Sequence, residues 1–175
     1  MSKKNSESGK QPVAEKLPAN IEHTTPTDWA MARQSLSEGR WYWLTTMRPD
    51  GRPHVRPILA VWLDDKLHFV SGKSTRKGKN LASSSHCVIS VATDDAHLVV
   101  EGEAAKVHDE ARLQQVADVY ASKYDWPVTV RDEAFYADYG APTAGPPAYE
   151  VYELTPRMVY GFGTEESFSP TRWRF

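Results

Sequence analysis

The segment from Ser74 to Leu81 contains the residue types that can bind a phosphate group. Its sequence, Ser-Thr-Arg-Lys-Gly-Lys-Asn-Leu, follows a strand-like apolar run at 67–70 and opens a short helical stretch. The first N–H groups of a helix have no partner within it, and the helix dipole favours an anion there. Arg76 and Lys77 would add charge-assisted hydrogen bonds. The competing interpretation is a solvated basic loop, which is what most short charge clusters are.

Other residues that could do chemistry give weaker signals. The histidines, at positions 23, 54, 68, 86, 97 and 108, lack the spacing with cysteine or carboxylate residues that a metal site needs, so no metal is expected. The single cysteine, Cys87, precedes the apolar residues 88–91 and is expected to be a buried filler and not a nucleophile. One cysteine rules out an internal disulfide, which is typical of a protein from a reducing cytoplasm.

Length and charge restrict the possible partners. A chain of 175 residues is expected to form one domain. Lys plus Arg total 21 against 23 for Asp plus Glu, and this near neutrality argues against a nucleic-acid partner. No run approaches the roughly 18 apolar residues that span a bilayer, and the polar N-terminus does not resemble a secretory signal. We therefore expect a cytoplasmic protein with neither a membrane nor a nucleic-acid partner.

The composition also predicts a domain boundary near residue 24. Residues 1–23 are rich in Lys, Ser, Glu and Pro, and are expected to be a disordered or loosely ordered arm. Residues 24–175 would then form the single domain.

The elements that would position the phosphate site are mainly strands. Helices are expected at 26–38, 76–83, 109–124 and 131–139, and strands at 41–47, 54–63, 66–71, 86–93, 97–107, 149–154, 158–161 and 168–175. Gly102 suits a bulge, and Trp41 and Trp43 share one strand face, so at least one of them should be in the core. Residues 140–147 form a Pro/Gly loop long enough to cover a site. Many antiparallel strands with few helices indicate a small β-barrel.

The order hairpin, strand, Ser-x-Arg-Lys-Gly-Lys-x-Leu helix and hairpin resembles the flavin-binding split barrel of the pyridoxamine 5'-phosphate oxidase family. The resemblance implies a mainly β fold with helices (α+β), a split antiparallel Greek-key barrel of about six strands. It implies that Arg76 and Lys77 hold the phosphate of flavin mononucleotide (FMN) and that Arg56 faces the cofactor. The other cofactor-binding residues that follow are Pro57, Val70, Ser71, Thr75, Lys79 and Asn80. It further implies a homodimer with two cofactors in clefts between the subunits.

The chain departs from the vitamin B6 oxidase in ways that affect its cofactor and substrate. The family's Arg-x-Val-Leu-Leu-Lys strand becomes residues 56–61, which lack the lysine, and its Tyr-Thr-Asn becomes residues 70–72. Actinobacterial-type relatives fit better, because they share the Asp-Gly-Arg-Pro-His hairpin at 50–54, the Glu-Gly of strand 97–107 and the terminal Trp-Arg-Phe. Those relatives use FMN or the deazaflavin coenzyme F-420. Both cofactors carry a ribityl phosphate, so the basic cluster suits either.

The expected function is that of an FMN-binding oxidoreductase that transfers a hydride between the flavin and a small organic substrate. The alternatives are a reductase dependent on coenzyme F-420, or a non-catalytic protein that carries a flavin or haem. A haem carrier would need a histidine such as His54, His86 or His97. No catalytic residue is assigned, because the flavin ring itself carries the hydride.

Four residues are candidates for the substrate pocket or the dimer seam: His54, Trp126, Arg172 and Trp173. Each has a structural alternative. His54 suits a cross-strand surface role beside the cofactor strand, and Trp126 suits the packing of aromatics at a helix end. The terminal Arg172 and Trp173 suit a plain edge strand.

Overall fold

The structure, a computed structural model, describes residues 11–18, 25–140, 143–164 and 169–175. The helices of these ranges are α1 (Trp29–Glu38), α2 (Arg76–Ser83) and α3 (Glu110–Tyr124). The strands are β1 (Val13–Lys16), β2 (Tyr42–Met47), β3 (Pro53–Ile58), β4 (Ala60–Leu63), β5 (Lys66–Gly72), β6 (His86–Ala92), β7 (Ala96–Lys106), β8 (Thr129–Arg131), β9 (Ala134–Tyr136), β10 (Tyr149–Gly163) and β11 (Thr171–Arg174).

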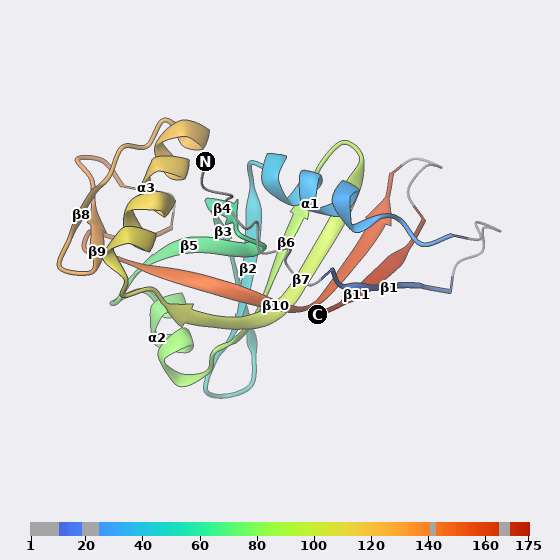
Figure 1. Cartoon of the computed structure of the whole chain (residues 1–175). Helices are drawn as coiled ribbons and strands as arrows, with labels where there is room; N and C mark the ends of the chain where they lie inside the picture. Colours follow the sequence, from blue (N-terminus) through green and yellow to red (C-terminus); the bar gives the residue numbers. More distant parts are fainter. Residues whose placement is uncertain (1–10, 19–24, 141–142, 165–168) are drawn as a thin grey trace, which may run out of the picture.

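The strands form an antiparallel sheet that curls without closing, as in a split barrel (Figure 1). Its main path runs β1-β11-β10-β7-β6-β2-β3, and the β4–β5 hairpin pairs with the first part of β10. β3 and β4 are consecutive and are separated only by Leu59, but β3 pairs with β2 whereas β4 pairs with β5. These two strands therefore belong to opposite sides of the split. The mainly β fold class with helices is therefore confirmed.

Two buried clusters lie on either side of the curled sheet. The first lies between α1 and the inner face of the sheet, where Trp29 and Leu36 pack with Tyr42, Leu44 and Trp173. The second lies beneath α3 and contains the helix residues Leu113, Val116 and Tyr120 with Val61 and Val151 of the sheet. Burial of apolar area in these clusters is the main source of stability.

Two of the predicted helices begin at residues whose side chains cap them. The Asp28 carboxylate accepts a hydrogen bond from the Ala30 N–H at 2.8 Å, and α1 ends at Gly39. The Asp109 carboxylate accepts from the Arg112 N–H at 2.7 Å at the start of α3. Side-chain acceptors at the N-cap satisfy N–H groups that the helix leaves free.

The helix predicted at 131–139 is wrong. Residues 129–136 form the β8–β9 hairpin, in which Asp132 and Glu133 adopt positive φ angles of 51° and 56°. The hairpin forms because β9 pairs with β10, and Phe135 of β9 is completely buried in the second cluster. A long-range strand partner thus overrides the local helical pattern.

Placing Trp41 or Trp43 in the core is also wrong, since their exposed fractions are 62% and 50%. The inner face of β2 is instead occupied by Tyr42 and Leu44. Alternation along a strand fixes that the two tryptophans share a face, but it leaves open which face is buried.

The two strands predicted at 149–154 and 158–161 form one continuous strand, β10. β10 runs through Pro156, with a register shift between Pro156 and Met158 opposite Gly102 of β7. A Cβ atom at Gly102 would lie 2.2 Å from the Thr155 carbonyl oxygen, so this close approach requires glycine. The irregularity expected at Gly102 is present.

The N-terminal segment contains a strand where a loose arm is predicted. β1 pairs with β11 in register Val13↔Arg174, and Glu15 forms ion pairs with Arg172 and Arg174. Residues 1–10 and 19–23 of the predicted arm lie outside the described residues. No helix of the described chain is long and apolar enough to cross a membrane.

Candidate functional site

The start of α2 is held against the end of β5 by a cap that uses the hydroxyls of Ser71 and Thr75, two of the predicted cofactor-binding residues. The Thr75 hydroxyl donates to the Gly72 carbonyl at 2.8 Å and accepts from the Gly78 N–H at 3.1 Å. The Ser71 hydroxyl is buried and lies 2.9 Å from the Thr75 hydroxyl. Thr75 and Ser71, which we expected to donate to a phosphate, therefore serve the helix cap in this structure.

Glycine at position 78 permits this close contact. A Cβ atom there would lie 2.7 Å from the Gly72 carbonyl oxygen and 3.2 Å from that of Lys73. Both are backbone atoms, which cannot move aside without shifting the helix. Gly78 therefore fixes how closely the first turn of α2 approaches β5.

Four cationic residues from three segments gather around this helix start. Arg76 and Lys77 belong to α2, Arg56 to β3 and Arg48 to the β2–β3 turn, which lies beside α2 (Figure 1). The charges of all four act on His54, and they lower the pKa of its imidazole in addition to the larger effect of burial. We call Arg48, Arg56, Arg76 and Lys77 the cationic cluster.

The cationic cluster has an excess of positive charge. None of its members forms an ion pair with a described carboxylate, whereas ion pairs are formed by Arg33, Arg52, Arg112, Arg131, Arg157, Arg172 and Arg174. Asp50, in the same turn as Arg48, is bound by the Arg52 guanidinium at 2.8 and 3.1 Å. That bond, more than the charges of Arg48 and Arg76, holds the Asp50 pKa below its usual range. Unpaired cations grouped in this way favour an anionic ligand.

Lys77 is the buried member of the cationic cluster, with an exposed fraction of 2%. Burial, and secondly the charge of Arg56, lower the pKa of Lys77 to about 8. Its ammonium donates to the Thr143 carbonyl oxygen, and the Thr143 hydroxyl donates to the Pro57 carbonyl at 2.7 Å. The Gly72 N–H donates to the Ala144 carbonyl at 2.8 Å. Residues 143–144 of the predicted Pro/Gly loop thus bridge α2, β3 and β5.

Three buried polar atoms near the cationic cluster have no hydrogen-bond partner: Arg48 Nε, His54 Nδ1 and Asn80 Oδ1. The Asn80 amide donates to the Thr46 hydroxyl at 2.9 Å, and Thr46 is the cross-strand partner of His54. Buried polar atoms normally find a partner, so a set of unpartnered ones indicates a place for a ligand or ordered water. The Arg48 Nε–H donor fits an anionic group, whereas the Asn80 Oδ1 acceptor needs a donor such as a hydroxyl or a water molecule.

The structure brings together most of the predicted site residues. Arg56, Arg76 and Lys79 are exposed, Pro57 is half-buried on β3, and Lys77, Asn80 and His54 are buried around the start of α2. Val70 does not join them, because it packs in the second cluster beneath α3.

Trp126, Arg172 and Trp173 lie outside this grouping. Trp126 is 2% exposed and its indole N–H donates to the Tyr139 carbonyl at 3.0 Å, so it packs in the second cluster. Trp173 is completely buried against Trp29, with ring centroids 5.6 Å apart. Arg172 pairs with Glu15 of β1. In the described chain these three residues have structural partners. The plain edge strand predicted for Arg172 and Trp173 is wrong, because β11 lies between β1 and β10 and pairs with both.

Arg48 and Thr46 are site residues that the sequence analysis missed. Both belong to the β2–β3 hairpin, whose register pairs Thr46 with His54 and Leu44 with Arg56. The turn at 48–52 fixes that register, so counting outward from the turn would have placed Thr46 opposite His54.

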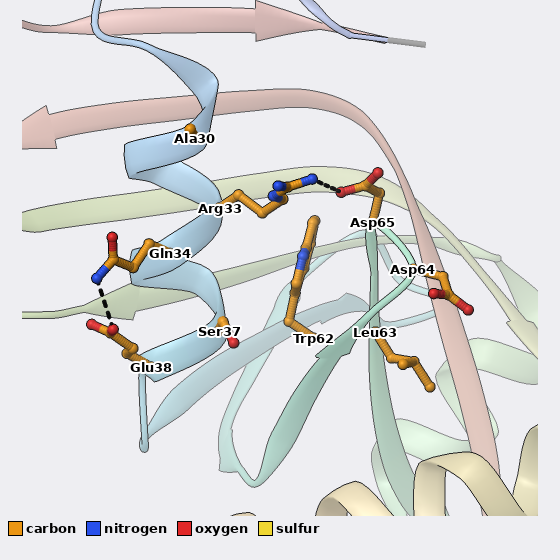
Figure 2. Close-up of a pocket in the computed structure, with 9 residues that line it drawn as sticks. All are labelled: Ala30, Arg33, Gln34, Ser37, Glu38, Trp62, Leu63, Asp64 and Asp65. Atoms are coloured by element: carbon orange, nitrogen blue, oxygen red, sulfur yellow. Dashed lines mark hydrogen bonds and ion pairs between the residues drawn. The ribbon is translucent and has the colours of Figure 1, made fainter. Parts of the chain in front are cut away.

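A separate cavity lies between α1 and the β4–β5 hairpin. It has a volume of about 610 Å³ and is shown in Figure 2. Its charged side chains are already engaged, since Arg33 pairs with Asp65 at 3.6 Å and the Gln34 amide donates to Glu38 at 2.9 Å. It contains none of the predicted site residues. No cluster of three or more described His, Cys, Asp or Glu residues could hold a metal ion.

Comparison with known proteins gives both a family and a fold. The family model described as pyridoxamine 5'-phosphate oxidase matches residues 30–162. No curated protein sequence matches the chain.

Three solved structures with the same fold have less than 25% sequence identity to this chain. An F-420 reductase is 21% identical with a TM-score of 0.51, covering 73% of this chain and 94% of that chain. A heme binding protein from Mycobacterium smegmatis is 17% identical with a TM-score of 0.61, and the match covers 82% of this chain and 57% of that chain. A FAD-binding protein from Mesorhizobium loti is 16% identical with a TM-score of 0.56, covering 93% and 99%. At these identities the structural matches support the fold alone.

Proposed function

Because the chain belongs to the pyridoxamine 5'-phosphate oxidase family, we propose that it is an FMN-binding oxidoreductase acting on a small organic substrate. The observation that carries this proposal is the cationic cluster, whose four members lack carboxylate partners among the described residues. The ribityl phosphate of FMN is the anion that such a site would bind.

The residues present fit that group. Arg76 and Arg56 are exposed and would bind phosphate oxygens with their guanidinium groups, while Lys77 adds a buried charge. A charge in a buried site interacts more strongly with an anion than one in water. Asn80, through its bond to Thr46, would keep α2 in place over β2. When bound, the flavin ring supplies the hydride chemistry.

Coenzyme F-420 is the second candidate cofactor. It has the same ribityl phosphate, so the cationic cluster supports it as well as FMN, and one structural neighbour is an F-420 reductase. A non-catalytic carrier of flavin or haem is the third candidate, since another neighbour is a heme binding protein.

We also propose that two copies of the chain form a homodimer through the outer face of β2 and its neighbours. Trp43, Met47 and Val55 are 50%, 44% and 42% exposed on this face. The register places Trp43 beside Pro57, and Thr45 beside both Val55 and Val88. A groove of about 490 Å³ that includes Met47 and Val88 opens on it. An exposed apolar face of a sheet is costly unless another surface covers it.

The visible spectrum of the purified protein separates the candidate cofactors. A two-band flavin spectrum supports the proposal, whereas a single deazaflavin band or a Soret band selects one of the alternatives. Reduction of the bound cofactor, followed by reoxidation with candidate acceptors, then distinguishes an enzyme from a carrier.

The phosphate assignment is tested with the double variant Arg76→Ala and Lys77→Met. Methionine keeps the apolar stem that fills the buried position of Lys77. We expect folded protein that loses at least roughly a hundredfold in FMN affinity, because the loss of two charge-assisted hydrogen bonds removes about 1.5–3 kcal/mol each. The control is Arg131→Ala, which removes an exposed charge of the β8–β9 hairpin. Unchanged FMN affinity in the double variant would refute the assignment.

A further inference from the structure

His54 is a buried histidine without a neutralising partner. Its exposed fraction is 4%, and its Nδ1 atom is buried without a hydrogen-bond partner. His68, a second buried histidine, lies with its Nε2 atom 3.0 Å from a Glu153 carboxylate oxygen. The imidazole of His54 therefore lacks the anion that usually stabilises a buried histidinium.

The four charges that lower the pKa of His54 most strongly all belong to the cationic cluster. The β2–β3 turn contributes Arg48, β3 contributes Arg56, and α2 contributes Arg76 and Lys77. The turn also contains Asp50, but its carboxylate is bound by Arg52. Both burial and this surrounding charge keep the imidazole neutral in the free protein, because they hold its pKa below the usual range.

We infer that His54 is the proton-accepting residue of the anion site: binding of an anionic group within the cationic cluster is coupled to uptake of one proton by the His54 imidazole. The proton comes from solvent and adds to an unprotonated ring nitrogen, so no other bond changes. The anion cancels the positive charge that opposes protonation, and a histidinium in turn attracts the anion. The inference rests on the proposed function only for the identity of that anion as a cofactor phosphate.

This coupling is reciprocal. If the anion favours protonation of His54, then protonation must increase anion affinity by the same factor. Anion affinity is therefore expected to rise as the pH falls through the range in which the bound form of His54 takes up its proton. The site would hold its anion most tightly in mildly acidic solution.

The first test is an NMR titration of the imidazole signals of the whole protein between pH 5 and 8. The His54 signal is assigned by its loss in His54→Gln. The probe is sodium sulfate, a dianion that does not titrate in this range, against sodium chloride at equal ionic strength. We expect sulfate to raise the pKa of His54 by roughly one unit, a tenfold coupling. An unchanged pKa with sulfate bound, as shown by shifts of the Arg56 and Arg76 side-chain signals, would overturn the inference.

The second test uses FMN and calorimetry in buffers of different ionisation enthalpy near pH 6.5. FMN titrates on its own phosphate, so the relevant quantity is proton uptake by the wild type minus that by His54→Gln. A positive difference supports the coupling, and a zero difference with FMN bound to both proteins overturns it. If FMN fails to bind while sulfate still raises the His54 pKa, the flavin assignment fails and the coupling stands.

Discussion

Lys77 combines near-complete burial with a positive charge, and the charge depends on pH within an accessible range. Burial and the charge of Arg56 lower its pKa to about 8, from 10.5. The folded protein therefore loses this charge as the pH rises through about 8. A flavin phosphate is fully ionised above pH 7, so its own titration does not contribute there.

We expect FMN affinity to fall roughly tenfold between pH 7 and pH 9, because the site loses one unit of positive charge beside a dianion. Fluorescence titration of FMN at several pH values measures this. In Lys77→Arg the guanidinium stays charged, and the affinity should change much less over the same range. A wild-type affinity that is constant from pH 7 to pH 9 would show that the Lys77 charge does not act on the phosphate. His54 acts in a separate, more acidic window.

At the scale of the element, the placement of α2 depends on Gly78. A methyl group there would meet the Gly72 carbonyl oxygen at 2.7 Å, so α2 would have to move away from β5. That movement would also displace the Lys77 ammonium from the Thr143 carbonyl oxygen, because Lys77 directly precedes Gly78. The phosphate site and the packing of the helix are thus coupled through one backbone contact.

We expect Gly78→Ala to lower the free energy of unfolding by roughly 1–3 kcal/mol through overpacking, and to weaken FMN binding as well. Chemical denaturation and FMN titration measure the two effects. Ser83→Ala, at the exposed end of the same helix, is the control and should change both by little. If Gly78→Ala kept the wild-type free energy of unfolding and FMN affinity, the close contact between α2 and β5 would be required for neither stability nor FMN binding.

At the scale of the whole molecule, the outer face of β2 and β3 is an exposed apolar surface. The other face of the sheet carries α1, and Leu36 of that helix packs in the same cluster as Leu44 of β2. The exposed Trp43 and Val55 therefore face away from the core of their own chain. A second copy is the partner that we propose for them.

We expect the double variant Trp43→Lys and Val55→Lys to raise the dimer dissociation constant on the order of a hundredfold or more, because an unpaired ammonium buried in an interface costs several kcal/mol. Analytical ultracentrifugation of the wild type and the variant measures this. The matched control, Met31→Lys, places the same charge on an exposed apolar position of α1 and should leave the dimer intact. A wild type that sediments as a monomer would refute the homodimer.

Local signals in the sequence were sufficient to predict helices at 26–38, 76–83 and 109–124, which the structure contains as α1, α2 and α3. Their caps Asp28, Thr75 and Asp109 form because a side-chain acceptor beside a free helix N–H is a short-range arrangement, although Thr75 was expected to bind the cofactor. Thr75, Arg76 and Lys77 lie together because they are consecutive residues at the start of α2. These features depend on neighbours a few positions apart.

Only the tertiary structure decided features that depend on distant partners. Phe135 lies in a strand because β10 pairs with it, and Trp43 is exposed because Tyr42 and Leu44 occupy the inner face. Arg48 joins the cationic cluster only when the β2–β3 hairpin folds beside α2. The sequence by itself determined which charges are available to bind a phosphate. The fold determined that four of them meet around a buried histidine without a carboxylate partner, because strand pairing across long separations sets which side chains share a face.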